Sequence, residues 1–384
     1  MRHIDAYRDG ALAHTLVERI AKIAQPDRNY AFMEFCGGHT HTISRYGLEN
    51  LLPSNIRLVH GPGCPVCVLP VGRLAAAIDL AKTRPVTLCV YGDLMRVPTA
   101  HGYSLLSAKA DGADIQMIYS PLDAVRLAMN NPQREVVFFA IGFETTAPAT
   151  AQTILFAERN KLSNFTIICN HVLTPPAMDA IMAPSPANPA AKLDGFIGPG
   201  HVATITGLAD FEQIGKRHAR PVVIAGFEPL DILQALFMLM QQVHEGRANI
   251  QNQYRRAVST CGNRLAQAAM KQVFTLRDSF EWRGLGLVAN SALRLREQYA
   301  QFDAERRYPI PIPCIEDHPA CACGEILRGA KDPTDCRLFG AACTPETPIG
   351  SCMVSSEGAC AAHWAYGRVH NKGLKPRAVQ ETPR

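Results

Sequence analysis

Short apolar runs recur between residues 56 and 229, and each is followed by a Gly/Pro turn and a helical pattern. The runs share β-branched or other apolar residues and are IRLVHGPG (56–63), VTLCVYGD (86–93), IQMIYSP (115–121), EVVFFAIGFETT (135–146), FTIICNH (165–171), LDGFIGPGH (193–201) and PVVIAGFEP (221–229). Near-continuous apolar strands that alternate with helices are typical of parallel sheets buried on both faces. The pattern predicts an α/β fold for this region.

Two turn phrases occur twice in the same region. The phrase GPGC (61–64) is echoed by GPGH (198–201), and GFE (142–144) is echoed by GFE (226–228). Two similar parallel-sheet α/β domains that face each other would explain the echoes. Chance recurrence of turn residues after strands would explain them equally well.

The pattern changes after Pro229. Long helices are predicted over residues 231–246 and 254–274, and the chain becomes rich in Pro, Gly and Cys from Pro309 onward. We therefore expect a third, mainly helical and irregular domain that begins near residue 250. Residues 368–384 have too few apolar side chains to pack, so a flexible tail is predicted there.

Composition and charge narrow the class of protein. The chain has 384 residues, of which 47% are hydrophobic and 19% charged, so it can build more than one core. Its net charge of +5 is spread without a Lys/Arg-rich block. Nucleic acid is therefore not an expected partner.

The segment from Met1 to Gln25 is interrupted by charged side chains and lacks the apolar run of a secretory signal. No later stretch approaches the roughly 18 apolar residues that a membrane-spanning helix needs. We expect a cytoplasmic protein without membrane contact. Thirteen cysteines in such a chain favour metal binding or redox chemistry over a disulfide scaffold.

The first cysteine motif is EFCGGHTH (34–41), which follows an apolar segment. A thiolate at a strand end, followed by two glycines whose amides can approach a ligand, fits a metal or anion site at Cys36. His39 and His41 offer further ligation or proton transfer. A buried cysteine beside two surface histidines is the alternative.

The second motif is GPGCPVC (61–67), a turn after the expected strand over 56–60. The spacing of Cys64 and Cys67 permits a reversible disulfide with one thiol activated near a helix start. The pair could also be half of a zinc site, but no nearby partner pair follows in the sequence. Redox or iron chemistry is favoured for these two cysteines.

The third motif is a group of six cysteines between residues 321 and 360. The run Cys323, Cys336, Cys343 and Cys360 is widely and unevenly spaced, unlike the two close pairs of a zinc ribbon. Four thiolates on irregular loops fit a 4Fe–4S cluster better. Two further cysteines keep the ligand choice open, with Cys321 a rival to Cys323 and Cys352 a possible spectator.

The remaining cysteines stand alone. Cys89, Cys169 and Cys261 lie in strand or helix patterns and are expected to be small buried hydrophobic residues, whereas Cys314 is undecided.

Polar residues that follow strands are further candidates. Glu144 and Thr145 follow one expected strand, and His171 and His201 follow two others, where α/β proteins place ligand sites. Helix capping or turn stabilisation would account for them as well. The sequence contains neither nucleotide-binding fingerprint and no Ser nucleophile elbow, so dehydrogenase and hydrolase functions lack support.

Taken together, four segments resemble the HypD family of hydrogenase maturation proteins. They are FCGGHTH (35–41), GPGCPVC (61–67), AIGFETTAP (140–148) and CGEILRGAKDPTDCRLFGAACTPETPIGSCMVSSEGACAAHW (323–364). The resemblance implies two similar α/β domains and a third domain that carries a 4Fe–4S cluster. It also implies a pairing with the small chaperone HypC, forming the scaffold on which iron gains one carbonyl and two cyanide ligands. Cyanide would come from HypE, and the finished unit would pass to the hydrogenase large subunit.

By the same resemblance, Cys36 would bind a transient Fe(II) ion jointly with a HypC cysteine, and Cys64 and Cys67 are further candidate metal ligands. Soft thiolate ligands suit an iron that carries cyanide and carbonyl. If cyanide arrives as a thiocyanate, the Cys64/Cys67 dithiol could supply the two electrons that its release requires. His39, His41 or Glu144 would deliver protons.

The predicted division of the chain combines these patterns with the resemblance. It comprises an N-terminal helix that packs on the third domain (1–28), two α/β domains (29–121 and 122–249), the cluster domain (250–367) and the tail (368–384). Two other functions stay open at this point. They are a ferredoxin-linked thiol–disulfide oxidoreductase and a zinc-stabilised interaction module.

Overall fold

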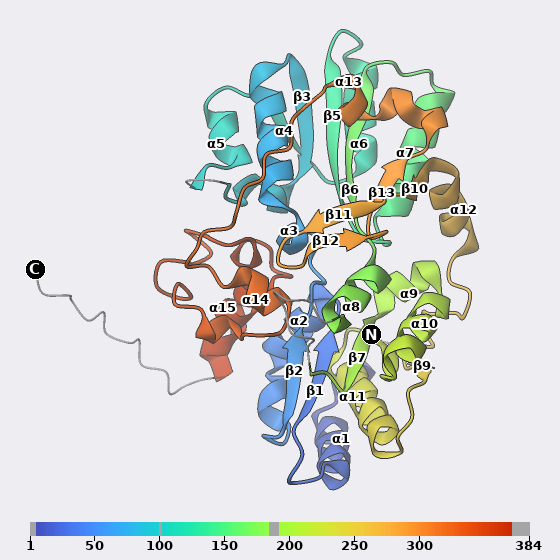
Figure 1. The fold of residues 1–384 in the computed structure, drawn as a ribbon, viewed down its shortest axis with the longest axis vertical. Helices are drawn as coiled ribbons and strands as arrows, with labels where there is room; N and C mark the ends of the chain where they lie inside the picture. Colours follow the sequence, from blue (N-terminus) through green and yellow to red (C-terminus); the bar gives the residue numbers. More distant parts are fainter. Residues whose placement is uncertain (1–4, 100–101, 184–191, 371–384) are drawn as a thin grey trace, which may run out of the picture.

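The computed structural model describes residues 5–99, 102–183 and 192–370. Its framework consists of two parallel sheets, which lie one above the other in Figure 1. Sheet A has the strand order β2-β1-β7-β8-β9, and sheet B has the order β4-β3-β5-β6. The predicted α/β fold with two parallel sheets is confirmed.

The strands coincide with the apolar runs of the sequence. Their bounds are Tyr30–Glu34 (β1), Ile56–His60 (β2), Val86–Tyr91 (β3), Ile115–Ile118 (β4), Glu135–Gly142 (β5), Phe165–His171 (β6), Gly195–Pro199 (β7), Val222–Ala225 (β8) and Ile250–Asn252 (β9). Every residue of β6 and all but the first residue of β5 are buried. Burial on both faces explains why these segments are continuously apolar rather than alternating.

Helices pack against both sheets. Their bounds are Gly10–Ile23 (α1), Gly37–Tyr46 (α2), Pro65–Val68 (α3), Val71–Thr83 (α4), Leu105–Ala110 (α5), Pro121–Asn130 (α6), Ala147–Arg159 (α7), Thr174–Met182 (α8), Gly200–Thr206 (α9), Ala209–His218 (α10) and Pro229–His244 (α11). The start of α6 shows the local cause, because Ser120 and Asp123 form a capping box around Pro121 at the first helical position. The short helix α3, which follows β2 of sheet A, contacts β5 of sheet B and lies between the two sheets (Figure 1).

The N-terminal helix α1 packs against α11. Asp9 caps α1, and its apolar face, which includes Leu16 and Ile20, contacts the apolar face of α11. The expectation for residues 1–28 stays a prediction, because the segment just before α1 does touch the expected third domain, where the Arg256 guanidinium lies 3.8 Å from the centroid of the Tyr7 ring.

The two sheets do not divide the chain at residue 121, where the boundary between the two α/β domains was expected. The chain leaves sheet A after β2, builds all of sheet B, and then returns to sheet A with β7. Both GPG phrases (61–64 and 198–201) consequently follow strands of sheet A, whereas the two GFE phrases (142–144 and 226–228) follow one strand of each sheet. Local patterns identify strands but not their order, which depends on tertiary packing.

Residues 264–307 add a mixed layer to sheet B. The elements are Arg264–Val273 (α12), Phe274–Leu276 (β10), Ser279–Trp282 (β11), Gly286–Ala289 (β12), Leu293–Leu295 (β13), Glu297–Phe302 (η5) and Ala304–Arg307 (α13). Phe274 and Phe302 share a core with Phe138 and Phe165 of sheet B. The helix predicted over residues 231–246 is confirmed by α11, but the one predicted over 254–274 is wrong before residue 264, where the chain turns and Gly262 adopts a φ of +64°.

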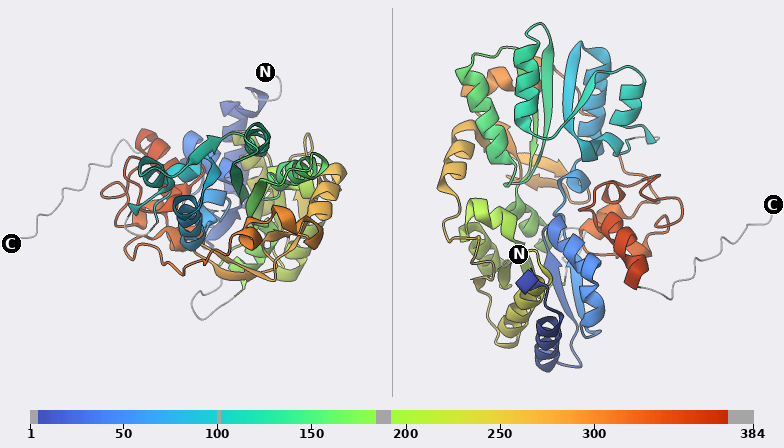
Figure 2. Two further views of the ribbon diagram at one scale, coloured as in Figure 1. Left: turned by 90° about the horizontal axis from the view of Figure 1, so that it is seen from above. Right: turned by 180° about the vertical axis from the view of Figure 1, so that it is seen from behind.

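The Cys-rich segment is mostly loops. Its short elements are Cys323–Leu327 (α14), Pro333–Asp335 (η6), Ser351–Met353 (η7) and Ala359–His370 (α15). Helix α15 packs on α2 of sheet A, and both views in Figure 2 show this red segment beside the blue N-terminal strands and helices. Helix α15 ends at His370, past the expected boundary at 367, and the rest of the predicted tail lies outside the described residues.

Candidate thiol and metal centre

Cys36 lies at the carboxyl end of β1 and forms the N-cap of α2, in an extended conformation with φ −153° and ψ 127°. The residue is half-buried, and the surrounding protein still desolvates its sulfur. This burial raises the pKa of the Cys36 thiol to about 12, aided by Glu34 and Glu357 and opposed by the amides of Gly38 and His39. The thiol is therefore protonated at neutral pH, and a metal ion that binds it must displace the proton.

Three glycines allow other segments to approach Cys36. A Cβ atom on Gly63 would lie 2.5 Å from the Cys36 nitrogen, and one on Gly38 would lie 2.9 Å from the Phe227 ring and 3.7 Å from Cys36 Sγ. A Cβ atom on Gly37 would clash with Glu357 of the Cys-rich segment. The turns after β1, β2 and β8 and the Cys-rich segment therefore meet around one thiol.

The two histidines of the motif differ in their surroundings. His39 is fully buried, its ring stacks on Phe227 with 4.9 Å between centroids, and its Nε2 lies 3.3 Å from the carbonyl oxygen of Ala225. Among the described residues, His39 Nδ1 has no hydrogen-bond partner. His41 lies farther along α2 and contacts Tyr366 of α15, with 2.9 Å between Nε2 and the hydroxyl oxygen. Burial lowers the pKa of both rings, so both are neutral near pH 7.

Cys64 and Cys67 are joined in a disulfide at α3. Both residues are buried, Cys64 caps the helix, and the amide of Cys67 donates to Cys64 Sγ at 3.2 Å. A disulfide between the two residues is what their spacing predicts. In this oxidised form neither sulfur is available to a metal, so the predicted ligand role of the pair requires its reduction first.

The six C-terminal cysteines surround one small cavity. They are Cys321, Cys323, Cys336, Cys343, Cys352 and Cys360. All four predicted cluster ligands are therefore brought together, and so are both rivals. The donor set fits an iron–sulfur cluster, because four or more thiols from irregular loops converge on one space with apolar neighbours such as Phe339 and Met353.

Two of these six thiols form a close pair. The sulfurs of Cys323 and Cys352 are 2.6 Å apart, closer than unbonded sulfur atoms normally approach. Thiol donation from Cys321 and Cys352 lowers the pKa of Cys323. This pair also lies on the side of the cavity that faces the disulfide, since Ser351 Oγ is 3.6 Å from Cys323 Sγ and donates to the carbonyl oxygen of Cys67 at 3.1 Å.

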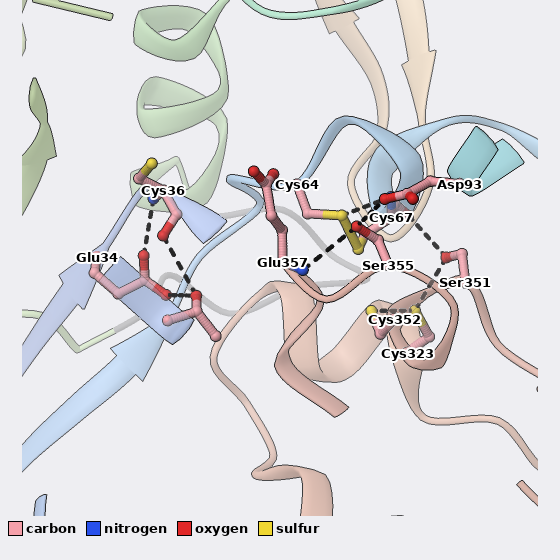
Figure 3. The surroundings of a disulfide bond; sticks show 11 residues. Glu34, Cys36, Cys64, Cys67, Asp93, Cys323, Ser351, Cys352, Ser355 and Glu357 are labelled. Carbon is pink, nitrogen blue, oxygen red and sulfur yellow. Dashed lines mark hydrogen bonds between the residues drawn. A yellow bond between two sulfur atoms is a disulfide. The ribbon is translucent and has the colours of Figure 1, made fainter. Parts of the chain in front are cut away.

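The three cysteine sites thus form a row. Figure 3 shows Cys36, the Cys64–Cys67 disulfide and the Cys323–Cys352 pair in sequence across one view, with Glu357 between the first two. The contact of Gly63 with Cys36 and that of Ser351 with Cys67 connect the row. Among the described residues, no three His, Cys, Asp or Glu side chains converge as ligands of a single metal ion.

A comparison with known protein families gives a match over nearly the whole chain. The family model HypD, described as "Hydrogenase formation hypA family", matches residues 11–367. The chain belongs to the HypD family.

Curated HypD relatives match almost the whole chain. A "Hydrogenase maturation factor HypD" of Rhizobium leguminosarum bv. viciae is 59% identical over 374 residues, which cover 97% of each chain. The proteins of the same name from Azotobacter vinelandii and Escherichia coli K12 are 57% and 45% identical, over 96% and 95% of this chain and 97% and 98% of theirs. No helix in the described part of this HypD-family chain is long and apolar enough to cross a membrane.

Glu144, the remaining predicted site residue, lies elsewhere in the HypD fold. Its buried carboxylate accepts the amide and the hydroxyl of Thr174, at 2.8 and 3.0 Å, and so caps α8. It lines a separate cleft of about 830 Å³ that no cysteine lines. Burial raises the pKa of Glu144 to about 7. The structure thus supports the capping alternative for Glu144 and does not bring it to the cysteine row.

The remaining histidine and cysteine candidates differ in their burial and contacts. His171 is buried and lies 2.9 Å from the Thr150 hydroxyl, whereas His201 is exposed and its ring stacks on Phe227. Cys89 and Cys169 are buried as predicted. The prediction for Cys261 was wrong, because this cysteine is exposed in the turn before α12, outside the helix that the pattern suggested; Cys314 is exposed too.

Sequence reasoning missed three residues of the HypD site. Glu357 is an exposed residue that lies against Gly37, the ring of Phe227 lies against Gly38, and Ser351 connects the six-cysteine cavity to Cys67. Partial desolvation of its carboxylate, with the nearby charges of Asp93 and Glu34, raises the pKa of Glu357. The sequence offers one signal for Glu357, which is its position within the C-terminal cysteine motif. Its contact with Gly37 joins segments that lie far apart along the chain, so the sequence did not predict that contact.

Proposed function

We propose that this chain is a maturation factor for NiFe hydrogenases, on which an iron ion receives its cyanide and carbonyl ligands. The observation that carries the proposal is the continuous row from Cys36 through the Cys64–Cys67 disulfide to the six-cysteine cavity. A thiol that binds cargo, a two-electron couple and a site for an electron-transfer cluster are the three parts that reductive cyanide transfer requires.

Cys36 is the proposed holder of the iron cargo. A single thiolate gives an iron ion too few ligands, so a HypC-type chaperone would contribute a second cysteine. Binding releases the Cys36 proton, and the amides at the start of α2 favour the resulting negative charge. Glu357, whose charge helps to raise the pKa of Cys36, and His39, on the first turn of α2, are the proposed groups that take up or return this proton.

The Cys64/Cys67 pair is the proposed reductant for a thiocyanate carried by a HypE-type donor. In this step the donor's S–CN bond breaks, the two thiols lose two electrons and two protons, and their S–S bond forms. The donor sulfur and the cyanide each receive one proton, so the step is balanced. A new round requires two electrons and two protons from an external reductant, and the finished iron unit would pass to the hydrogenase large subunit.

A 4Fe–4S cluster in the six-cysteine cavity would, when bound, supply electrons one at a time. The sequence favoured Cys323, Cys336, Cys343 and Cys360 as its holders. The thiols of Cys321 and Cys352 both donate to Cys323, so Cys321 and Cys352 stay in the choice of ligands beside the four that the sequence favoured.

The test uses the chain in complex with a HypC-type chaperone, purified anaerobically from cells that assemble hydrogenase. Cys36→Ala should abolish the cyanide and carbonyl infrared bands while leaving soluble yield and cluster absorption near wild type. Cys261→Ala, which removes an exposed thiol outside the row, is the matched control and should change nothing. Bands of wild-type intensity in Cys36→Ala would show that the iron is held elsewhere.

A second function is favoured by the part of the row that joins the six-cysteine cavity to the disulfide. The link from Ser351 to Cys67 also suits a ferredoxin-linked thiol–disulfide oxidoreductase that reduces a protein substrate. That function makes no use of Cys36, so infrared bands that depend on Cys36 distinguish the two. A zinc-stabilised module would contain zinc and no sulfide in an anaerobic metal analysis.

A further inference from the structure

Glu34, the last residue of β1, is a buried acid that lies two residues before Cys36. Its side chain is 0% exposed. One carboxylate oxygen accepts the amide of Cys36 at 2.8 Å, and the other accepts the hydroxyl of Thr40 on α2 and Nδ1 of His60 at 3.1 Å. Glu34 and His60 are register partners on β1 and β2. The carboxylate therefore connects the strand pair, the Cys36 turn and the first turn of α2.

A buried carboxylate is costly unless it is paired and hydrogen-bonded, and Glu34 has both kinds of partner. An apolar residue here would leave the Cys36 amide without its acceptor, which destabilises the turn. No side chain of the N-cap residue caps α2, so its first turn has no other anchor of this kind. The Glu34 contacts thus restrain the extended backbone at Cys36, and with it the direction of the thiol.

From this geometry we infer that Glu34, held by His60, is the positioning residue of the Cys36 thiol. It touches neither the thiol nor the cargo, and it acts through the Cys36 backbone. The inference rests on the proposed function only for the identity of the iron cargo that the Cys36 thiol would bind. The restraint on the thiol itself is present in this chain without a partner. It predicts that a neutral side chain of the same shape loosens the Cys36 turn.

The test substitutes Glu34→Gln in the full chain. The amide group of Gln is a donor and would face one of the three donors that now meet the carboxylate. Glu49→Gln is the matched control, because Glu49 is an exposed residue near His60 without a hydrogen bond to the turn. Alkylation of Cys36 by iodoacetamide is followed by mass spectrometry, with the exposed Cys261 as the internal reference.

In Glu34→Gln, the ratio of Cys36 to Cys261 alkylation rates should rise about fivefold, because the half-buried thiol gains access to solvent and loses a nearby charge that raises its pKa. Thr40→Val keeps that charge, so a rise in this variant comes from the loosened turn alone. Glu49→Gln should keep the wild-type ratio. An unchanged ratio in folded Glu34→Gln would overturn the inference. If Glu34→Gln does not fold, Thr40→Val removes one donor and should raise the ratio about twofold, and an unchanged ratio there would overturn it equally.

The infrared bands of the chaperone complex give the second measurement. Their intensity should fall at least about tenfold in Glu34→Gln and stay unchanged in Glu49→Gln. A raised alkylation ratio together with wild-type bands that do not depend on Cys36 would refute the proposed function and leave the positioning role intact. An unchanged alkylation ratio together with infrared bands that depend on Cys36 would refute the positioning role and leave the proposed function intact.

Discussion

The turn after β1 in sheet A and the turn after β5 in sheet B have the same local pattern and different surroundings. In both, a buried strand ends near glycine, a polar candidate follows, and a helix begins within a few residues. The first turn places Cys36 beside Gly63 and Glu357, at one end of the cysteine row. The second places Glu144 against the amide of Thr174, where it caps α8.

The difference between the two turns comes from what lies next to them. Gly142 adopts a φ of +142°, and a Cβ atom there would clash with the Thr146 hydroxyl, so the turn after β5 closes on itself. The turn after β1 opens toward the turns after β2 and β8 and the Cys-rich segment. A polar residue at a strand end is thus a site only when neighbouring turns bring further reactive groups to it.

The largest effect that we expect comes from substitutions in the six-cysteine cavity, at the end of the row opposite Cys36. Cys336→Ala and Cys343→Ala should each abolish cluster absorption and the associated iron and sulfide, because each removes one thiolate from the donor set. Cys352→Ala should keep most of the cluster, because the other five thiols of the cavity still supply four ligands. Anaerobic absorption spectra with iron and sulfide counts measure both outcomes.

The matched control for this series is Cys314→Ala, an exposed thiol outside the cavity. Loss of the cluster in Cys352→Ala would place Cys352 among the ligands. Retention of the full cluster in both Cys336→Ala and Cys343→Ala would reject the ligand set that the sequence favoured.

A smaller effect is expected at the turn after β5, where Glu144 lies. The pKa of Glu144 is raised to about 7 in the folded chain, above its ordinary value of 4.5, so the folded state holds a proton that the unfolded state releases. Stability from this group is fully present below about pH 4.5 and is lost as pH rises through about 7. Glu144→Gln cannot ionise, and its stability relative to wild type should therefore improve by about 1–2 kcal/mol between about pH 5 and pH 8.

Urea unfolding of both proteins at the two pH values measures this change. Glu158→Gln changes an exposed residue on the neighbouring helix α7, serves as the control and should give no such pH-dependent difference. Loss of the infrared bands in Glu144→Gln would contradict the separation of the two turns, since it would give Glu144 a role at the cysteine row.

Sequence patterns predicted much of this fold for identifiable physical reasons. Most of the seven apolar runs were recognisable as strands because both of their faces are buried, as in β5 and β6; β4, with two exposed central residues, is the exception. The short strands β10 to β13 were missed, since three or four residues with alternating exposure resemble the turns around them. Sheet order was not predictable either, because the pairing of β1 with β7 joins Phe32 to Gly195, which lie far apart along the chain.

The candidate site was predictable to the extent that its chemistry depends on residue type and spacing. Thiols at Cys36, at Cys64 and Cys67, and in the C-terminal motif all line the row. Glu34 and Glu357 were missed as functional candidates, because only tertiary contacts distinguish them from other acidic residues. The pairing of Cys323 with Cys352 was likewise hidden, since six thiols offer many partners and the fold selects among them.

The central claim is that the three cysteine sites operate as one row, and the redox state of Cys64 and Cys67 tests it most directly. The chain, alone and anaerobic, is treated with a one-electron viologen donor, and free thiols are then alkylated and identified by mass spectrometry. In wild type both cysteines should become alkylated together, whereas in Cys336→Ala, which lacks the cluster, they should remain a disulfide. Equal reduction of the pair in both proteins would contradict the account, because electrons would then reach the disulfide without passing through the cysteine cavity.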